Sequence, residues 1–380
     1  MNELIALGRQ LWDRAEPGFF ERETHRILKD RFLNLGLSVQ EFDGIPGFIA
    51  SSDGKARDKT VALLADMDGL PSGDGGSYGH FCGHHLQMTA LYSTALRLSE
   101  GSPQILSRIA FVATPAEEYV DLDKRETLKL QGKLQRFSGK QELIERGLFE
   151  SFHFVVATHA AELGVGRGVS SVLRMNGFEV FRFRFQGKSA HAGAHPHLGK
   201  NAQNSGSLFL QACAFLREEF PEDRHIRIHP VLRLRPDQAV NLVPDLVTVE
   251  TYVRAVEEAT VQEVADKLCR AARGCAKAIG NSVDIERIQG YAPFAADYDL
   301  HTLLRSVAAS EGVEFVEEEF SAASTDMGDV SQIKPAIIVG LPGSNGRFHS
   351  PEFRVTDEQA AYVFPGEILR AYLTRLVERT

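Results

Sequence analysis

Amphipathic stretches and short apolar runs alternate along the first part of the chain. Residues 2–16 and 24–35 repeat apolar positions with a period near 3.6, which predicts two helices. Residues 60–65 (TVALLA) instead form an unbroken apolar run of strand length, and residues 88–98 return to helical spacing. Helices that alternate with buried strands in this order are typical of an α/β fold.

Polar side chains that can bind metals follow three apolar runs, residues 60–65, 105–114 and 152–158. Cys82 and His84 come after the first run, Glu117 and Glu118 after the second, and His159 directly after the third. The loops at the carboxyl ends of strands converge at one edge of an open α/β sheet. We therefore expect these side chains to lie close together, although they are far apart in the sequence.

The pattern changes between residues 172 and 289. Residues 177–187 (GFEVFRFRFQG) alternate apolar and charged positions, which predicts a half-exposed antiparallel strand. Further strands are expected at 226–234, 245–255 and 282–289, with helices at 201–219 and 260–279. This order is that of a compact α+β unit of the split-βαβ type. The expected organisation is one domain formed by residues 1–171 and 290–380, with residues 172–289 inserted as a second domain.

Composition narrows the classes of protein. The formal net charge of −9 argues against nucleic acid and anionic membrane surfaces as partners. No uninterrupted apolar segment approaches the 18 residues of a membrane span, and the N-terminal residues do not resemble a signal peptide. Four cysteines are few for 380 residues, which favours free thiols in a reducing compartment. We therefore expect a cytoplasmic protein.

His349, in a late loop of the first domain, adds a fifth candidate ligand. Taken singly, each candidate could be an ordinary buried or surface residue. Taken together, thiolate, imidazole and carboxylate ligands suit zinc, manganese, nickel or cobalt. Five ligands exceed the three or four of one zinc site, so two divalent metals with a shared bridge are expected. Glu117 and Glu118 point in opposite directions on an extended segment. Glu118 can therefore bind a metal while Glu117 acts as a general base.

Eight motifs follow one another along nearly the whole chain. They are ADMDGLP (65–71), HFCGHHLQMTA (80–90), TPAEE (114–118), ATHA (157–160), GKSAHAGAHPHLGKNA (187–202), NLVPD (241–245), STDMGDVS (324–331) and HSPEF (349–353). In these motifs the chain resembles the di-metal aminoacylase/carboxypeptidase metallopeptidase family. The branch it resembles contains hippurate hydrolase, the plant auxin-conjugate hydrolases and aminobenzoyl-glutamate hydrolase.

The resemblance implies a fold, a metal site and an assembly. The catalytic domain would have a mixed central sheet flanked by helices, as in zinc exopeptidases, and the inserted domain would be a lid that also forms a homodimer contact. Metal ligands are implied at five positions, namely Cys82, His84, Glu118, His159 and His349. Glu117 would be the general base, and His191 of the inserted domain would help to polarise the scissile carbonyl. Weaker candidates, for substrate contact or for orienting a ligand, are Asp68, His229, Asn241 and Arg254.

Two features depart from the family pattern. His85 follows Cys-Gly-His where the family usually has Asp or Asn, so it could alter the hydrogen bonds around the ligands or compete as a ligand. The segment 119–150 is longer than the family pattern and is expected to form one or two helices at the rim of the site. The length of this segment leaves the identity of the substrate open.

These observations predict a metal-dependent hydrolase. It would cleave the amide C–N bond of an N-acyl or N-aroyl amino acid, or of a dipeptide-like substrate, by metal-bound hydroxide with Glu117 as the base. Zinc or manganese is the expected metal, with cobalt or nickel as alternatives. One alternative function is hydrolytic deamination of an aromatic amine at the same di-metal site. The other is a non-catalytic, metal-stabilised binding or dimerisation protein, which would have no need of Glu117.

Overall fold

The computed structural model describes residues 2–55, 59–73, 76–161, 163 and 166–379. The chain divides into two compact units. The first unit consists of Met1–Arg174, Phe294–Ser321 and Thr325–Thr380, and the second of Met175–Pro293 with Ala322–Ser324. The sequence pattern places the corresponding boundaries at residues 172 and 289. The roles of the two units as catalytic domain and as lid or dimerisation domain stay predictions.

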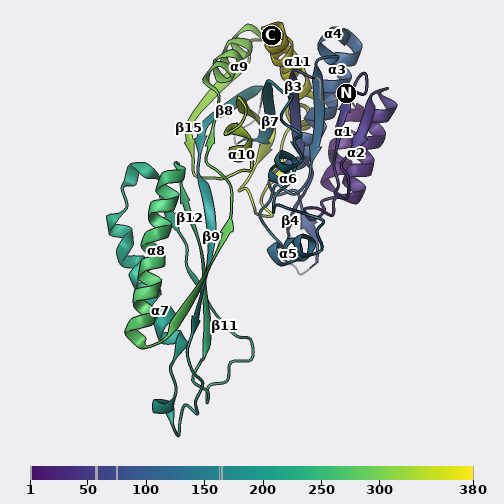
Figure 1. Cartoon of the computed structure of the whole chain (residues 1–380). Helices are drawn as coiled ribbons and strands as arrows, with labels where there is room; N and C mark the ends of the chain where they lie inside the picture. The colour runs from purple at the N-terminus through teal and green to yellow at the C-terminus, as the bar shows by residue number, and fades with distance from the viewer. Residues whose placement is uncertain (1, 56–58, 74–75, 162, 164–165, 380) are drawn as a thin grey trace. The chain divides into compact units, whose positions relative to one another are not determined.

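A mixed nine-stranded sheet forms the centre of the first unit (Figure 1). Its order is β1-β2-β6-β3-β7-β16-β8-β14, and β15 pairs with β8. The strands are β1 (Ser38–Glu41), β2 (Phe48–Ser51), β3 (Val61–Asp66), β6 (Ile109–Thr114), β7 (Phe154–Ala160), β8 (Gly168–Met175), β14 (Phe294–Ala295), β15 (Glu314–Ser321) and β16 (Ala336–Leu341). The expected α/β class with a mixed central sheet is confirmed.

The four central strands run parallel and end at the same level. In the register of β3 and β6, Asp66 lies beside Thr114, and in that of β7 and β16, His159 lies beside Gly340. Nearly all residues of these strands are buried, as expected for parallel strands covered on both faces. The loops that follow the four strands therefore begin along one edge of the sheet.

Helices cover this sheet and share its core. Helix α3 (His84–Gly101) packs against β3 and β7 and also contacts α1 (Asn2–Trp12) and α11 (Phe364–Glu378). Because α3 lies between the sheet and other helices, it is buried on nearly all sides, and its apolar residues do not form a single stripe. Helices α2 (Arg22–Asn34) and α9 (Tyr298–Ser310) complete this part of the core.

Two expected elements of the first unit differ in detail. The strand expected at 105–114 begins only at Ile109, because Pro103–Leu106 form the short helix α4 with Pro103 in its first turn. The segment 119–150 contains two helices, α5 (Leu122–Leu130) and α6 (Gly139–Glu145). The short helix α10 (Met327–Ser331) lies against α6.

The second unit is an antiparallel sheet with two helices on one face. Its strands are β9 (Gly177–Gln186), β10 (Arg227–Ile228), β11 (Val231–Leu234), β12 (Leu246–Ala255) and β13 (Ser282–Gln289). Three phenylalanines of β9, residues 181, 183 and 185, are fully buried beneath α7 (Ala202–Leu216) and α8 (Glu258–Ile279). The strand expected at 226–234 is split in two at Pro230, which has no N–H for the ladder.

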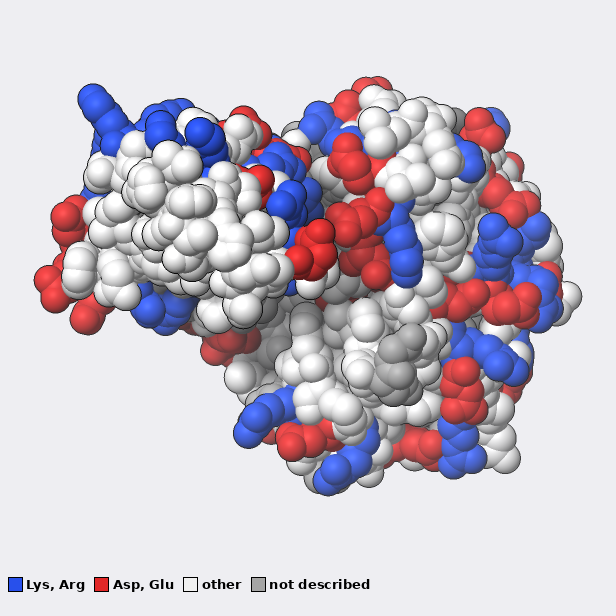
Figure 2. All heavy atoms as spheres, turned by 90° about the horizontal axis from the view of Figure 1, so that it is seen from below, with Lys and Arg blue, Asp and Glu red and all other residues white. Residues whose placement is uncertain are grey.

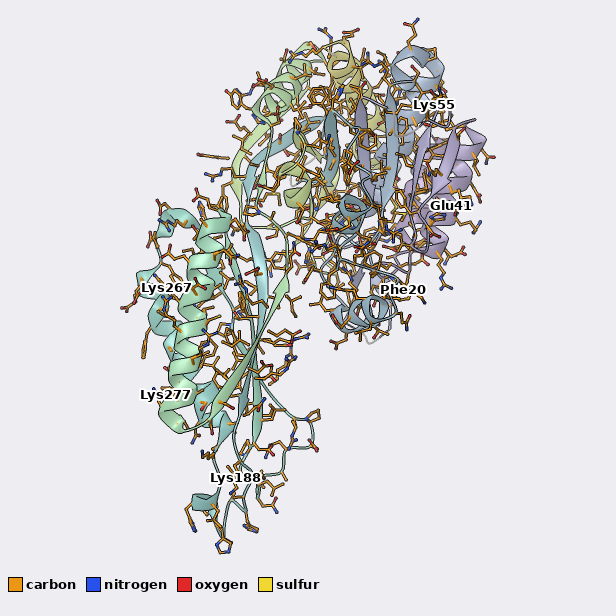
Figure 3. All side chains as sticks on the ribbon, viewed as in Figure 1. Phe20, Glu41, Lys55, Lys188, Lys267 and Lys277 are labelled. Atoms are coloured by element: carbon orange, nitrogen blue, oxygen red, sulfur yellow. The ribbon has the colours of Figure 1, made fainter. Side chains whose placement is uncertain are left out.

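On the face shown in Figure 2, charged side chains of both signs are interspersed in some parts, and broad areas of uncharged residues lie between them. Lys267 and Lys277 project from α8 (Figure 3). Within the described ranges, none of the helices combines the length and the apolar character that a membrane span requires.

Candidate metal centre

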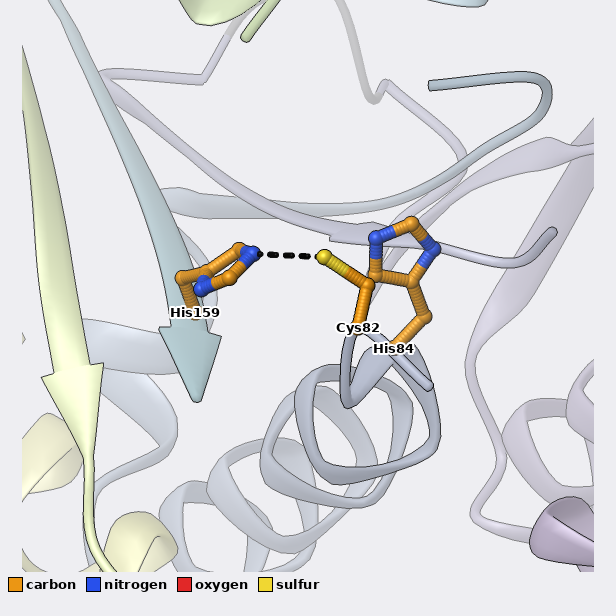
Figure 4. A group of neighbouring side chains, drawn as sticks. All are labelled: Cys82, His84 and His159. Atoms are coloured by element: carbon orange, nitrogen blue, oxygen red, sulfur yellow. Dashed lines mark hydrogen bonds between the residues drawn. The ribbon is translucent and has the colours of Figure 1, made fainter. Parts of the chain in front are cut away.

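Six of the predicted side chains converge where the four parallel strands end. The Cys82 sulfur lies 3.3 Å from Nε2 of His159 and 3.3 Å from Nε2 of His349. Figure 4 shows Cys82 and His84 beside the start of α3, facing His159 at the end of β7. Residues separated by up to 267 positions in the sequence thus share one site.

Two glutamates close the other side of this group. Nε2 of His84 lies 3.8 Å from a Glu117 oxygen and 3.9 Å from a Glu118 oxygen, and the same Glu118 oxygen lies 3.6 Å from Nε2 of His349. Three sets of potential ligand atoms lie within 4.8 Å of one another. They are Cys82–His84–His159, Cys82–Glu118–His349 and His84–Glu117–Glu118. Because the sets share members, the cluster can hold two neighbouring cations with a ligand between them.

Local backbone conformations direct these side chains into the site. Gly83 has φ 82°, and a Cβ there would lie 2.6 Å from the Cβ of Ala160, so the turn before His84 requires glycine. His349 is itself in the left-handed region, with φ 60°, and its N–H donates to the carbonyl of Phe81. This bond holds the late loop against the turn that carries Cys82.

Hydrogen bonds fix the tautomers of two candidate ligands. Nδ1 of His84 lies 2.8 Å from the Asp68 carbonyl oxygen, and Nδ1 of His159 lies 2.8 Å from the carbonyl oxygen of Ala160. A carbonyl oxygen only accepts, so each Nδ1 carries a proton, and Nε2 is the ring nitrogen that each histidine turns toward the cluster. This arrangement suits metal binding through Nε2.

The residues fit two divalent cations. Nε2 of His84 and Oε1 of Glu118 are buried and have no hydrogen-bond partner among the described residues. Burying such groups without a partner is costly, and a bound cation would supply one. Sulfur, imidazole and carboxylate donors together match zinc and related transition metals.

Burial makes the anionic forms of Glu117, Glu118 and Cys82 unfavourable in the metal-free protein. Burial and the neighbouring charge of Glu118 raise the pKa of Glu117 to about 8. Burial also raises the pKa of Glu118 to about 7. The pKa of the Cys82 thiol is raised well above its ordinary value by burial and by Glu118. Cations in the cluster would favour the ionised forms, which are the forms that bind metals.

Asp68 connects the two glutamates to His84. Its carboxylate accepts hydrogen bonds from the N–H groups of Glu117, at 3.1 Å, and Glu118, at 2.9 Å. The same carboxylate lies 3.2 Å from Nδ1 of His84 and is fully buried. Asp68 was expected to orient a histidine; its hold on the Glu117–Glu118 backbone was not expected.

His85 does not belong to the cluster. Its ring packs against Trp12, 4.9 Å between centroids, and against Tyr362, at 5.8 Å. The ring of His80 lies 5.6 Å away, and neither histidine appears in a ligand set among the described residues. Burial lowers the pKa of both rings, that of His80 to about 3, so both are neutral. The sequence left open whether His85 competes as a ligand or alters the hydrogen bonds around the ligands. Its position in α3 directs the ring into the helix layer, outside the ligand sets of the described residues.

The predicted residues of the second unit fall into two groups. The backbone of His191 pairs with Leu242, and the Ala192 N–H donates to the Asn241 carbonyl, so His191 and Asn241 are neighbours before β12 begins. Arg254 lies near the far end of β12. At 3.3–3.4 Å per residue, roughly 27 Å of strand separates it from Leu246, where β12 begins. Its guanidinium covers the ring of Tyr252, which stacks on His229. The four candidates therefore do not form one cluster.

Lys140 is a buried charge that the sequence did not single out. Its ammonium is fully buried, lies 2.7 Å from Asp326 and also binds Asp66 at the end of β3. Burial acts to lower the pKa of Lys140, but the charges of Asp326 and Asp66 outweigh it and raise that pKa. Through Asp66 and Asp326, Lys140 thus joins α6 to β3 and to the start of α10, beside Glu117. The motif STDMGDVS contains Asp326, but its partner follows only from the fold.

The family comparison agrees with this geometry. Residues 62–369 match the family model described as peptidase family M20/M25/M40. The chain belongs to this family. It is accordingly a metal-dependent amidohydrolase or peptidase.

Curated relatives of the family include the expected branch. The chain is 27% identical to Xaa-Arg dipeptidase of Mus musculus over 88% of this chain and 75% of that protein. It is 24% identical to an IAA-amino acid hydrolase of Arabidopsis thaliana, over 94% and 83%. It is 23% identical to hippurate hydrolase of Campylobacter jejuni, over 94% and 93%. The predicted branch is thereby confirmed.

Solved structures share the fold. A putative aminohydrolase from methicillin-resistant Staphylococcus aureus superposes with a TM-score of 0.79 at 20% identity, covering 98% of this chain and 96% of that one. A dinuclear metal-binding peptidase of the M20 family from Bacillus subtilis superposes with a TM-score of 0.75 at 19% identity, covering 100% and 99%. These similarities confirm the architecture of the chain.

Replacing Lys140 tests the buried ion pair. Lys140→Met leaves the carboxylates of Asp66 and Asp326 buried without their cation, which should cost about 3–5 kcal/mol of unfolding free energy. Chemical denaturation measures this loss. Lys133→Met, at an exposed position of the same segment, is the control and should change stability by less than about 0.5 kcal/mol. Equal stability of the two variants would contradict the assignment.

The pH dependence of stability tests the environment of Glu117. In the folded metal-free protein its pKa is about 8, above the ordinary value of 4.5. The folded state therefore holds this proton more tightly, and the resulting stability is present below pH 4.5 and lost as the pH rises through 8. Metal-free wild type should lose stability relative to Glu117→Gln over this interval. A difference between their melting temperatures that does not vary with pH would show that Glu117 is not buried as described.

Proposed function

We propose that the protein hydrolyses the amide bond between an acyl or aromatic acyl group and an amino acid, or the amide of a dipeptide-like substrate. The observation that carries this proposal is the convergence of five candidate ligands with one further side chain, the carboxylate of Glu117. A purely structural metal site needs ligands alone, whereas hydrolysis also needs a base. The names of the relatives, which include hippurate hydrolase and N-acetyl-L-cysteine deacetylase, support this class of substrate.

The proposed ligands are Cys82, His84, Glu118, His159 and His349. Two divalent ions, zinc or manganese foremost and cobalt or nickel as alternatives, would act as Lewis acids and lower the pKa of water at the site. Asp68 and the carbonyl of Ala160 hold His84 and His159 with Nε2 toward the cluster. Glu117 takes the proton from the attacking water and delivers it to the leaving amine.

His191 supplies a hydrogen-bond donor in this proposal. Its Nδ1 accepts hydrogen bonds from the N–H groups of Gly193, at 3.2 Å, and Ala194, at 3.0 Å. The proton of the neutral ring is therefore on Nε2. The N–H at Nε2 can donate to the scissile carbonyl oxygen as negative charge develops there. The stretch that carries His191 follows β9 and includes Lys188, which is labelled in Figure 3.

Substrate contacts and assembly complete the proposal. Asn241 adjoins His191 and would contact the substrate with it. His229 and Arg254 stay weaker candidates, because one small amide cannot span the length of β12. We also propose a homodimer through the second unit. Its helix α7 exposes Leu208 and Phe215, the latter 71% exposed, on one side of the helix. A cytoplasmic location is part of the same proposal.

Turnover assays with the Glu117→Ala variant test the proposed chemistry. Purified protein reconstituted with zinc, manganese, cobalt or nickel is supplied with N-acyl amino acids, aminobenzoyl-glutamate and dipeptides, and the released amine is measured. Wild type should release an amino acid. Glu117→Ala should lower kcat by about 10²–10⁴-fold because the general base is lost. Metal content should remain unchanged in the variant, since Glu117 is not among the proposed ligands.

Three outcomes would contradict the proposal. Release of ammonia from an aromatic amine, with no amino acid formed, would favour deamination at the same site. Full turnover by metal-loaded Glu117→Ala would remove Glu117 from the mechanism. Tight metal binding without turnover of any compound tested would favour a non-catalytic binding protein.

A further inference from the structure

The backbone of residues 116–118 carries both proposed glutamates and adopts a conformation that it would not take alone. Ala116 has φ 54°, in the left-handed region that non-glycine residues seldom occupy. Such conformations persist only where the surroundings enforce them, and they are concentrated at functional sites. Ala116 is fully buried and immediately precedes Glu117. The groups that enforce its conformation therefore bear on the position of Glu117.

Glu21 makes the first of these contacts. Its side chain is completely buried just before α2, and Oε1 accepts a hydrogen bond of 2.7 Å from the Ala116 N–H. The turn before Glu21 lies directly against Ala116. A Cβ added to Gly18 in this turn would lie 2.9 Å from the Ala116 Cα. Burial and the charge of Asp68 raise the pKa of Glu21 well above its ordinary value. The mechanism proposed above assigns no role to this carboxyl group.

Arg125 makes a contact at the other end of the segment. This side chain belongs to α5, within the segment 119–150, and is only 1% exposed. One guanidinium nitrogen donates to the Glu118 carbonyl oxygen at 2.5 Å, and another donates to the Phe137 carbonyl oxygen at 2.6 Å. The guanidinium carbon lies 5.5 Å from the centroid of the Phe19 ring, which is close to Glu21 in the sequence.

The remaining backbone groups in this stretch are also held. The Gly139 N–H donates to the Ala116 carbonyl, and the Asp68 carboxylate accepts from the N–H groups of Glu117 and Glu118. Hydrogen bonds thus reach residues 116–118 from four separate parts of the chain. Two of these are the candidate positioning residues Glu21 and Arg125.

We propose that Glu21 and Arg125 are positioning residues which, with Asp68, hold the backbone of residues 116–118 so that Glu117 acts as the base and Glu118 as a metal ligand. The assignment rests on the function proposed above for these two glutamates. It gives α5 a role, because this helix supplies the arginine that binds the carbonyl of a proposed metal ligand. Neither residue touches the substrate or the metals in this proposal.

Paired substitutions at Glu21 test its role as a hydrogen-bond acceptor. Glu21→Gln retains an oxygen for the Ala116 N–H, whereas Glu21→Ala does not. Glu21→Ala should lower kcat and weaken retention of the metals against a chelator by about 10–100-fold, the range for residues that support ligands. KM should change little. Glu21→Gln should stay within about twofold of wild type on this scale. Glu23→Ala is the control, because Glu23 is exposed and its carboxylate forms an ion pair only with Arg26 among the described residues.

Chemical rescue tests Arg125. Arg125→Ala should show the same loss of kcat and of metal retention, and millimolar guanidinium should restore part of both by occupying the vacated space. Arg26→Ala, at an exposed surface pair, should show neither the loss nor the rescue. A purely structural role would lower the melting temperature without a loss of kcat in the folded fraction, and guanidinium would not restore it.

Defined results would overturn the proposal. One is wild-type kcat and metal retention in folded Glu21→Ala and Arg125→Ala. Another is a Glu21→Gln variant as impaired as Glu21→Ala, which would show that the acceptor oxygen is not what matters. Chelator competition is measured without any substrate. If wild type hydrolyses no amide, the proposed function fails, while the metal-retention measurements still decide whether Glu21 and Arg125 position Glu118.

Discussion

The Asp68 carboxylate is the point on which the metal centre depends. It accepts hydrogen bonds from two consecutive backbone N–H groups, those of Glu117 and Glu118, and it lies 3.2 Å from Nδ1 of His84. One buried group thus fixes a loop after β6 and the first residue of α3. Because charge-assisted hydrogen bonds are strong where water is excluded, this single side chain sets the spacing of three site residues.

Electrostatics explain why the site needs cations. Several carboxylates and a thiol lie together at the end of a buried sheet, and burial raises the pKa values of Glu117, Glu118 and Cys82. Lys140 lies on one side of the cluster, but its positive charge is already paired with the carboxylates of Asp66 and Asp326. Divalent cations would compensate the remaining negative charge, in agreement with the metal-dependent family to which the chain belongs.

The convergence of these side chains could be predicted from the sequence better than the residues around them. Cys82, His84, Glu117, Glu118 and His159 could be grouped because each follows an apolar strand, and parallel strands end at one edge. The direction of His85 could not be predicted, since it depends on how α3 rotates against α1 and α11. Glu21, Arg125 and Lys140 look like ordinary surface charges in the sequence, and only the fold shows that they are buried beside the site. The break at Pro230 could have been predicted from the sequence, because proline has no N–H to donate within a strand.

Anomalous diffraction from crystals grown with zinc or manganese locates the ions themselves and so decides whether the candidate site holds them. Two peaks are expected at the carboxyl ends of β3, β6 and β7. Both should lie within bonding distance, about 2.0–2.3 Å, of donors drawn from Cys82, His84, Glu118, His159 and His349. A single peak, or an ion bound by His80 or His85 instead, would contradict this expectation.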